Sequence, residues 1–180
     1  MLSDKQRDEI IPFYFYAMLN GFASTGRKDF RTADTHTKKY YFVPSADECK
    51  AGGFNHGFAL EDTWTNVTGT SRSAGYTYVK FHGCPVWVMQ YQGVYKKQAI
   101  PFLKLALRKA FEAKLFNAGR GPILYTNPEH EGMVYRNSKS QGDWELFVGY
   151  EEIIDTVHNV SLGWHQVNGM YLFGKNRDSI

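Results

Sequence analysis

The densest group of residues that could carry out acid–base chemistry is Glu151, Glu152, Asp155 and His158, close together near the C-terminal end. A carboxylate held beside a histidine can exchange a proton with a substrate. If this segment is a strand, however, Glu151 and Glu152 point to opposite faces of the sheet. We therefore expect an exposed edge or rim here rather than a catalytic site.

No other catalytic or metal-binding arrangement is indicated. The chain has no Gly-x-Ser-x-Gly motif, and neither Cys49 nor Cys84 has a histidine at a diagnostic spacing. His130 lies between Glu129 and Glu131, but three successive side chains cannot all point at one metal ion. We therefore predict no catalytic residue, no metal and no cofactor.

Composition limits the class of protein. The chain has 180 residues, of which 43% are hydrophobic, 22% charged and 16% aromatic, so it can bury one core. The aromatic excess favours sheet structure and surfaces that stack on flat ligands. The sequence has no apolar run of membrane-spanning length, and residues 1–10 are charged where a secretory signal would be apolar. These features predict a cytoplasmic protein that does not enter the membrane.

Positive charge is concentrated in the first half of the chain, although the net charge is only +3. Much of it lies between Arg27 and Lys39, in a segment rich in Thr, Asp and Gly that we interpret as a solvated loop. Contact with nucleic acid is the alternative for this segment. Direct DNA reading by this chain is not indicated, because no second helix with a turn follows residues 1–25.

The clearest strand pattern is a hairpin from Gly75 to Tyr95, turned either at Gly83 and Cys84 or by a four-residue loop from His82 to Pro85. An even loop length predicts an aliphatic face and an aromatic face. The aliphatic face would hold Val79, Phe81, Val86 and Val88. The aromatic face would hold Tyr76, Tyr78, Trp87, Met89 and Tyr91, and would be either covered by a helix or part of a binding surface.

Two helices are predicted, each with a proline in its first turn. The first runs from Pro12 to Asn20 and has no polar face, which predicts burial. The second runs from Gln98 to Leu115 with one apolar stripe. Strands are expected at 39–43 and 57–64.

The two helices begin with related residues, Ile11-Pro12-Phe13 and Ile100-Pro101-Phe102, and weaker matches follow in the same order along the sheet segments. We interpret this as an internal repeat. The predicted fold is α+β, with two tandem helix-plus-antiparallel-sheet units, 1–97 and 98–180, packed as one pseudo-symmetric domain.

Three segments carry a family resemblance: Gly75-x-Thr-Tyr-Val-x-Phe-His-Gly-Cys-Pro-Val-Trp-x-Met-x-Tyr-x-Gly93, Gly119-Arg120-Gly121-Pro122 and Gly149-x-Glu-Glu-Ile153. Over about residues 40–172 the chain resembles the bacterial domain of unknown function numbered 5680. Members of that family occur alone or behind an Xre-type helix-turn-helix domain, which implies a sensing or regulatory role and names no chemistry. The long N-terminal segment departs from the family pattern, as does the turn at His158-Asn159.

The remaining functional signal is the aromatic set. Where the two repeats meet, rings could line a groove for a small molecule or a protein partner, with polar anchors beside them. The candidate ligand-binding residues are Asp62, Trp64, Trp87, Tyr91, Arg120, Trp164 and His165. A single undivided sheet would remove a groove of this kind.

We therefore predict a non-enzymatic binding or regulatory module, which could form a homodimer. One alternative is a hydrolase that uses Glu61, Asp62, Glu151 or a histidine as acid or base. The other is a nucleic-acid-associated regulator that works through the basic segment.

Overall fold

The computed structural model describes residues 2–21, 23, 30–32, 36–66 and 69–172. The basic segment from Arg27 to Lys39 lies partly outside these residues, and Arg27 and Lys28 are among those not described. Lys38 and Lys39 belong to a strand, β2. The nucleic-acid alternative for this segment stays a prediction.

The described chain forms helices α1 (Asp4–Asn20), α2 (Ala46–Gly52) and α3 (Ile100–Glu112), with short 3-10 turns η1 (Lys97–Ala99) and η2 (Pro128–His130). The strands of the first half are β1 (Phe30–Thr32), β2 (Thr37–Phe42), β3 (Phe58–Asn66), β4 (Arg72–Phe81) and β5 (Cys84–Tyr95). Those of the second half are β6 (Leu124–Thr126), β7 (Met133–Gly142), β8 (Leu146–Asp155) and β9 (Val160–Tyr171).

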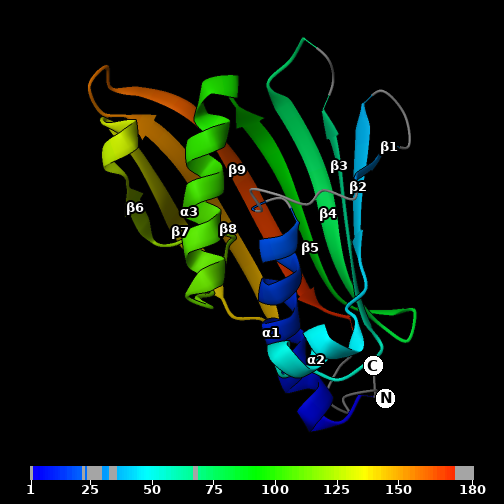
Figure 1. Ribbon diagram of the computed structural model, residues 1–180. Coiled ribbons are helices and arrows are strands. Elements are labelled where there is room, and N and C mark those ends of the chain that lie inside the picture. The colour runs from blue at the N-terminus through cyan, green and yellow to red at the C-terminus, as the bar shows by residue number, and fades with distance from the viewer. Residues whose placement is uncertain (1, 22, 24–29, 33–35, 67–68, 173–180) are drawn as a thin grey trace, which may run out of the picture.

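The strands form one antiparallel sheet in the order β1-β2-β3-β4-β5-β9-β8-β7-β6 (Figure 1). This confirms the α+β class. The two halves of the chain meet where β5 pairs with β9, with Trp87 opposite Tyr171 and Tyr95 opposite Gly163. The junction is therefore a hydrogen-bonded strand pair, and the predicted groove between two separate sheets is wrong. The internal repeat and its division into 1–97 and 98–180 stay predictions.

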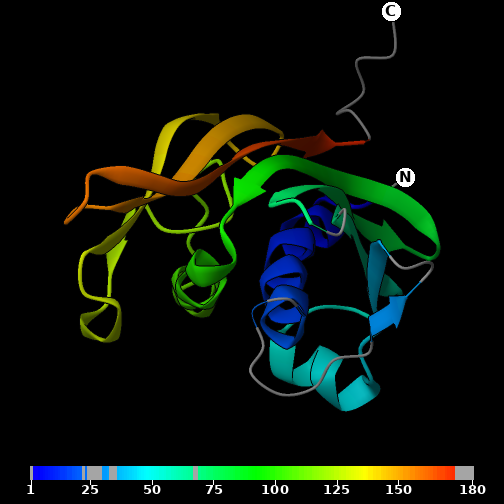
Figure 2. The same cartoon turned by 90° about the horizontal axis from the view of Figure 1, so that it is seen from above.

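The molecule has two layers. The sheet curves around α1 and α3, which lie side by side on its concave face (Figure 2). The helices contact each other through rings, with Phe111 of α3 at 5.9 Å from Tyr14 and 6.1 Å from Phe15 of α1 between ring centroids. Within the described residues, no helix lies on the opposite face of the sheet (Figure 2). We call the first the covered face and the second the open face.

Helix α1 begins earlier than predicted. Ser3 caps it, and the Ser3 and Gln6 side chains form a reciprocal capping box, so Asp4 is the first helical residue and Pro12 lies inside the helix. The prediction that Pro12 occupies the first turn was wrong because the charged residues before it are helical. The predicted burial is confirmed from Ile10 onward, where Phe13 is fully buried.

Helix α3 is close to the prediction, with Pro101 at its start. It ends at Glu112, before Leu115, which is exposed. The predicted apolar stripe is buried, and its buried members include Leu103, Leu107, Ala110 and Phe111. This helix and α1 provide the apolar cover of the sheet.

The hairpin β4–β5 has a different register from the predicted one. Its turn is the two-residue pair His82-Gly83, both at positive φ, as in a type I′ turn. A β-bulge then shifts the register next to Val79 and Lys80, so that Val79 pairs with Trp87. The bulge moves Trp87 and the alternate residues after it to the same face as Val79, and the predicted aliphatic and aromatic faces were wrong.

Candidate ligand-binding site

A cavity of about 250 Å³ opens on the covered face, above the strands where the two halves meet. Its floor comes from β3, β4, β5 and β9, and Met18 of α1 and Leu103 of α3 flank it. The lining residues are Met18, Asp62, Trp64, Asn66, Thr70, Ser71, Ser73, Met89, Tyr91, Tyr95, Lys97, Ile100, Leu103, Arg120 and His165. It is close to the lower size limit of small-molecule pockets, roughly 300 Å³.

Arg120 reaches this cavity from the loop after α3. The loop is held close to β7 by the Asn137 side chain, which donates to the Asn117 carbonyl at 2.9 Å. Gly119 has no Cβ, and a Cβ there would meet Asn137 Nδ2 at 2.6 Å. The close packing of this loop directs Arg120 inward, where only 6% of the residue is exposed.

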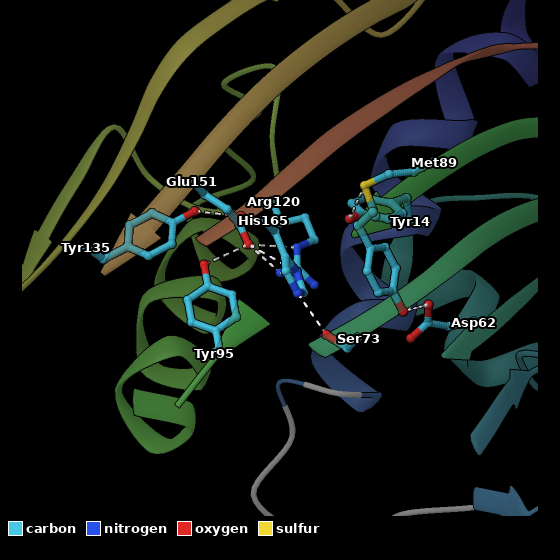
Figure 3. Close-up of polar contacts among 10 residues, drawn as sticks. Tyr14, Asp62, Ser73, Met89, Tyr95, Arg120, Tyr135, Glu151 and His165 are labelled. Carbon is cyan, nitrogen blue, oxygen red and sulfur yellow. Dashed lines mark hydrogen bonds and ion pairs between the residues drawn. The ribbon is translucent and has the colours of Figure 1, made fainter. Parts of the chain in front are cut away.

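Arg120 forms a buried ion pair with Glu151 on β8. Its Nε donates to Glu151 Oε1 at 3.1 Å, and its Nη2 contacts the same oxygen. The hydroxyls of Tyr135 and Tyr95 also donate to Glu151, at 2.9 Å and 3.3 Å. Burial alone would lower the pKa of Arg120, but the Glu151 carboxylate raises it overall. The carboxylate is thus held by one cation and two hydroxyls (Figure 3).

His165 connects this pair to Ser73. Arg120 Nη2 lies 2.7 Å from His165 Nδ1, and His165 Nε2 lies 2.9 Å from Ser73 Oγ. A guanidinium can only donate, so Nδ1 must accept and the neutral ring carries its proton on Nε2. Burial, and then Arg120, lower the pKa of His165 to about 2. His165 therefore donates to Ser73 and does not act as a base toward it.

This tautomer decides what Ser73 can do. A serine nucleophile needs a histidine nitrogen free to accept its proton. Here that nitrogen is protonated, so the Ser73 hydroxyl accepts from His165 and keeps its own proton for another acceptor. The Ser73–His165 contact in this arrangement suits binding and not nucleophilic attack.

A second polar group lies across the cavity, at Asp62 on β3. Its Oδ1 accepts hydrogen bonds from Thr77 at 2.8 Å and from the Tyr91 hydroxyl at 3.0 Å. The Arg120 guanidinium lies over the Tyr91 ring, 4.8 Å from its centroid. Burial raises the pKa of Asp62 to about 6, against the two hydrogen bonds and Arg120, which lower it.

Two glycines let aromatic rings reach across a strand. Tyr91 on β5 crosses over Gly75 of β4 to reach Asp62, and a Cβ at Gly75 would lie 2.6 Å from the Tyr91 hydroxyl. In the same way His165 on β9 crosses Gly93 of β5, where a Cβ would meet His165 Cδ2 at 2.7 Å. Both long-range contacts depend on the absence of a side chain on the intervening strand.

The structure gathers most of the predicted ligand-binding residues and separates two of them. Asp62, Trp64, Tyr91, Arg120 and His165 line the cavity.

Trp87 and Trp164 do not line this cavity. Trp87 is fully buried in the core, where its ring packs on Trp144 at 5.2 Å. Trp164 precedes His165 on β9 and so faces the other way, stacking on Tyr150 at 5.7 Å on the open face. The prediction that these two rings share one groove with the others was wrong. Strand alternation turns Trp164 to the open face, whereas Trp87 is on the same face as Tyr91 but lies further along β5, where it packs against Tyr14 of α1 at 5.0 Å.

The prediction for Glu151 was wrong. We expected an exposed rim at Glu151 and Glu152, but Glu151 is fully buried. His158 instead bonds Asp155 at 2.8 Å in the exposed turn after β8. The sequence did contain a signal for the burial of Glu151. Every second residue of this strand faces the core, and this face consists of Phe147, Gly149, Glu151 and Ile153, with Glu151 as its single acid. The roles of Ser73 and Tyr95 carried no signal in the sequence.

Among the described residues, no three His, Cys, Asp or Glu side chains lie together so that they could hold a metal ion. Within the same part of the chain, none of the helices has both the length and the apolar character to cross a membrane.

The fold and site define an α+β domain with a cavity beneath two helices, lined by both polar and apolar side chains. The sequence profile described as "Domain of unknown function (DUF5680)" matches residues 65–167, and the chain belongs to this family. The match is narrower than the resemblance noted above and begins after Asp62. No curated protein and no solved structure shows a significant match to the chain.

Proposed function

We propose that this domain is a binding module for a small molecule, which it takes up in the cavity between α1, α3 and the sheet. The observation that carries the proposal is the combination of a cavity of about 250 Å³ with buried charged groups already hydrogen-bonded around it. Buried polar networks with satisfied partners are rigid. Such a site is preorganised, so that little ordering is needed when a ligand binds.

The shape of the site favours a small molecule over a protein partner. The cavity is concave and lies beneath the two helices, whereas a protein partner needs an accessible area of about 800 Å² on each side. The rings of Tyr91, Tyr95 and Trp64 supply flat surfaces for a ring or a chain of carbons.

A regulatory role in the cytoplasm of a bacterium, or in a phage, is part of this proposal. Its support is the family resemblance, since related domains occur alone or behind Xre-type helix-turn-helix domains. In that setting, occupancy of the cavity would be the signal that is transmitted to a partner domain. The possible homodimer belongs to the same proposal.

The direct test is native mass spectrometry of the purified protein, followed by a thermal-shift screen of metabolites. Ile100→Trp places an indole at the cavity wall, and Lys109→Trp adds the same group at an exposed position on the same helix. We expect a retained or screened compound to bind the wild type and Lys109→Trp but not Ile100→Trp. Equal binding by all three proteins, or no binding compound at all, would refute the proposal.

A further inference from the structure

The most unusual group in the cavity is the Asp62 carboxylate. The residue is only 2% exposed, and both of its hydrogen bonds come from neutral hydroxyls and go to one oxygen, Oδ1. Among the described residues, no basic side chain forms an ion pair with Asp62 and no hydrogen bond reaches Oδ2. A buried carboxylate is normally paired with a cation or bound to a metal.

The nearby cation does not fill this role. Arg120 acts on Asp62 only through space, and its guanidinium is already bonded to Glu151. His165 is neutral because it is buried and because Arg120 donates to its Nδ1. Lys97, the third basic residue that lines the cavity, is exposed and forms no ion pair with Asp62. The Arg120–Glu151 pair is neutral as a whole, so the charge that remains uncompensated in the inner cavity is that of Asp62.

The surroundings of Asp62 also suit a positive charge. The rings of Tyr91 and Trp64 line the same cavity, together with the sulfur-containing side chains of Met18 and Met89. Aromatic faces attract cations, and they do so more strongly where water is excluded. An anion would instead be repelled by the Asp62 carboxylate, while the Arg120 guanidinium is already bonded to Glu151 and Lys97 is an exposed residue.

We propose that the ligand of this cavity is an organic cation, a protonated amine on an apolar body, whose ammonium group pairs with Asp62 Oδ2. This inference rests on the proposed function. The ammonium supplies the missing counter-ion, and the apolar body lies against Ile100 and Leu103. The Ser73 hydroxyl, which accepts from His165, can donate to an acceptor elsewhere on the ligand.

The proposal predicts a definite pH dependence, since a proton on Asp62 competes with the ligand. The groups that act on Asp62 from the elements packed against it are Tyr14 of α1, Thr77 of β4, Tyr91 of β5 and Arg120. Burial raises the pKa of both tyrosines, and Arg120 stays charged, so none of these groups changes charge between pH 5 and pH 8. Cation affinity should therefore fall as the pH drops through about 6, the pKa of Asp62.

The test compares three probes of one shape, benzylamine, benzyl alcohol and benzoate, by NMR titration at pH 8 and pH 5. We expect benzylamine to bind at least about tenfold more tightly than the other two at pH 8. Its affinity should fall about tenfold at pH 5. Asp62→Asn should abolish the preference for the amine, and Glu61→Gln should retain it, since Glu61 on the same strand pairs with Lys39 and Lys80 instead.

The outcomes separate this inference from the proposed function. If benzyl alcohol or benzoate binds as well as benzylamine, the cavity still binds small molecules but the cationic class is wrong. If benzylamine does not bind at millimolar concentration, or binds equally to Asp62→Asn, the inference is also refuted. In both cases the retained compound and the Ile100→Trp comparison decide the proposed function independently.

Discussion

The two faces of the sheet hold the same kind of ion pair in opposite environments, at Glu151 and Glu152, which are neighbours on β8. On the covered face Glu151 pairs with Arg120, and the two side chains are 0% and 6% exposed. On the open face Glu152 pairs with Arg136 at 2.7 Å, and the side chains are 15% and 50% exposed. The comparison teaches that the same residue types form a rigid site on one face and an ordinary surface on the other.

The largest effect is expected from breaking the buried pair. Arg120→Met leaves Glu151 buried with only the Tyr95 and Tyr135 hydroxyls, and should lower the free energy of unfolding by about 3–5 kcal/mol. Arg136→Met on the open face should cost less than about 1 kcal/mol. Urea unfolding of both variants measures the difference. Similar losses from the two variants would contradict the assignment of Glu151 to a buried network.

Replacing Asp62 should stabilise the protein, whereas replacing Arg120 should destabilise it. Its pKa is about 6 in the folded protein against 3.8 ordinarily, so the folded state holds the proton more tightly and ionisation destabilises the fold. Asp62→Asn should therefore raise the free energy of unfolding at pH 8 by about 2–3 kcal/mol relative to the wild type.

The stabilisation by Asp62→Asn should depend on pH. It should be complete above pH 6, shrink as the pH falls, and vanish below about 4, where the wild-type carboxyl is protonated in both the folded and the unfolded state. His165 acts in the other direction, because its lowered pKa removes stability as the pH falls below 6.5, but this contribution is present in both proteins and cancels. Urea unfolding across pH 4–8 measures the curve, and a destabilised Asp62→Asn at pH 8 would contradict the account.

Much of the architecture was predictable from local patterns. The α3 helix, the β4–β5 hairpin and the α+β class follow from periodicity and turn residues, which are local properties. The bulge beside Val79 was not predictable, because one extra residue leaves the alternation on each side intact while exchanging the faces. The bulge moves Trp87 and Tyr91 together to the covered face, and Trp87 lies in the core because α1 packs on that part of β5.

The candidate site was predictable in part. Asp62, Tyr91 and Arg120 could be singled out as an acid, a ring and a loop arginine beside strong patterns. The contacts among the residues of the site could not be predicted. For example, the contact between Ser73 and His165 joins β4 and β9, which are far apart in the chain. The sheet order brings them together, and sheet order depends on pairing over long sequence distances.

A smaller effect is expected from filling the space under Tyr91. Gly75→Ala places a Cβ at 2.6 Å from the Tyr91 hydroxyl and 2.5 Å from the Thr63 carbonyl, so both the ring and the paired β3–β4 backbone must shift, and the bond from Tyr91 to Asp62 weakens. We expect a loss of about 1–2 kcal/mol. Ala74→Ser, at the neighbouring exposed position, should change stability by less than about 0.5 kcal/mol. Thermal unfolding compares them, and an unaffected Gly75→Ala would exclude a fixed Tyr91.

The smallest effect is expected at Ser73. Ser73→Ala removes the acceptor for His165 Nε2 but leaves the Arg120–Glu151 pair intact, so the loss should be about 1 kcal/mol or less. The ¹⁵N NMR spectrum of the His165 ring should show protonation on Nε2 in the wild type and in the variant. Protonation on Nδ1 would mean that Arg120 does not hold the ring and that Ser73 could be activated as a nucleophile.

The central claim is that the covered face holds a buried carboxylate without a counter-ion, ready for a ligand. The most direct test is a pH titration of the Asp62 carboxyl carbon by ¹³C NMR, without ligand and with benzylamine. The account predicts a midpoint close to pH 6 in the free protein, and a lower midpoint when the amine is bound. A midpoint near the ordinary 3.8 in the free protein would show that Asp62 is solvated or already paired, and would contradict the account.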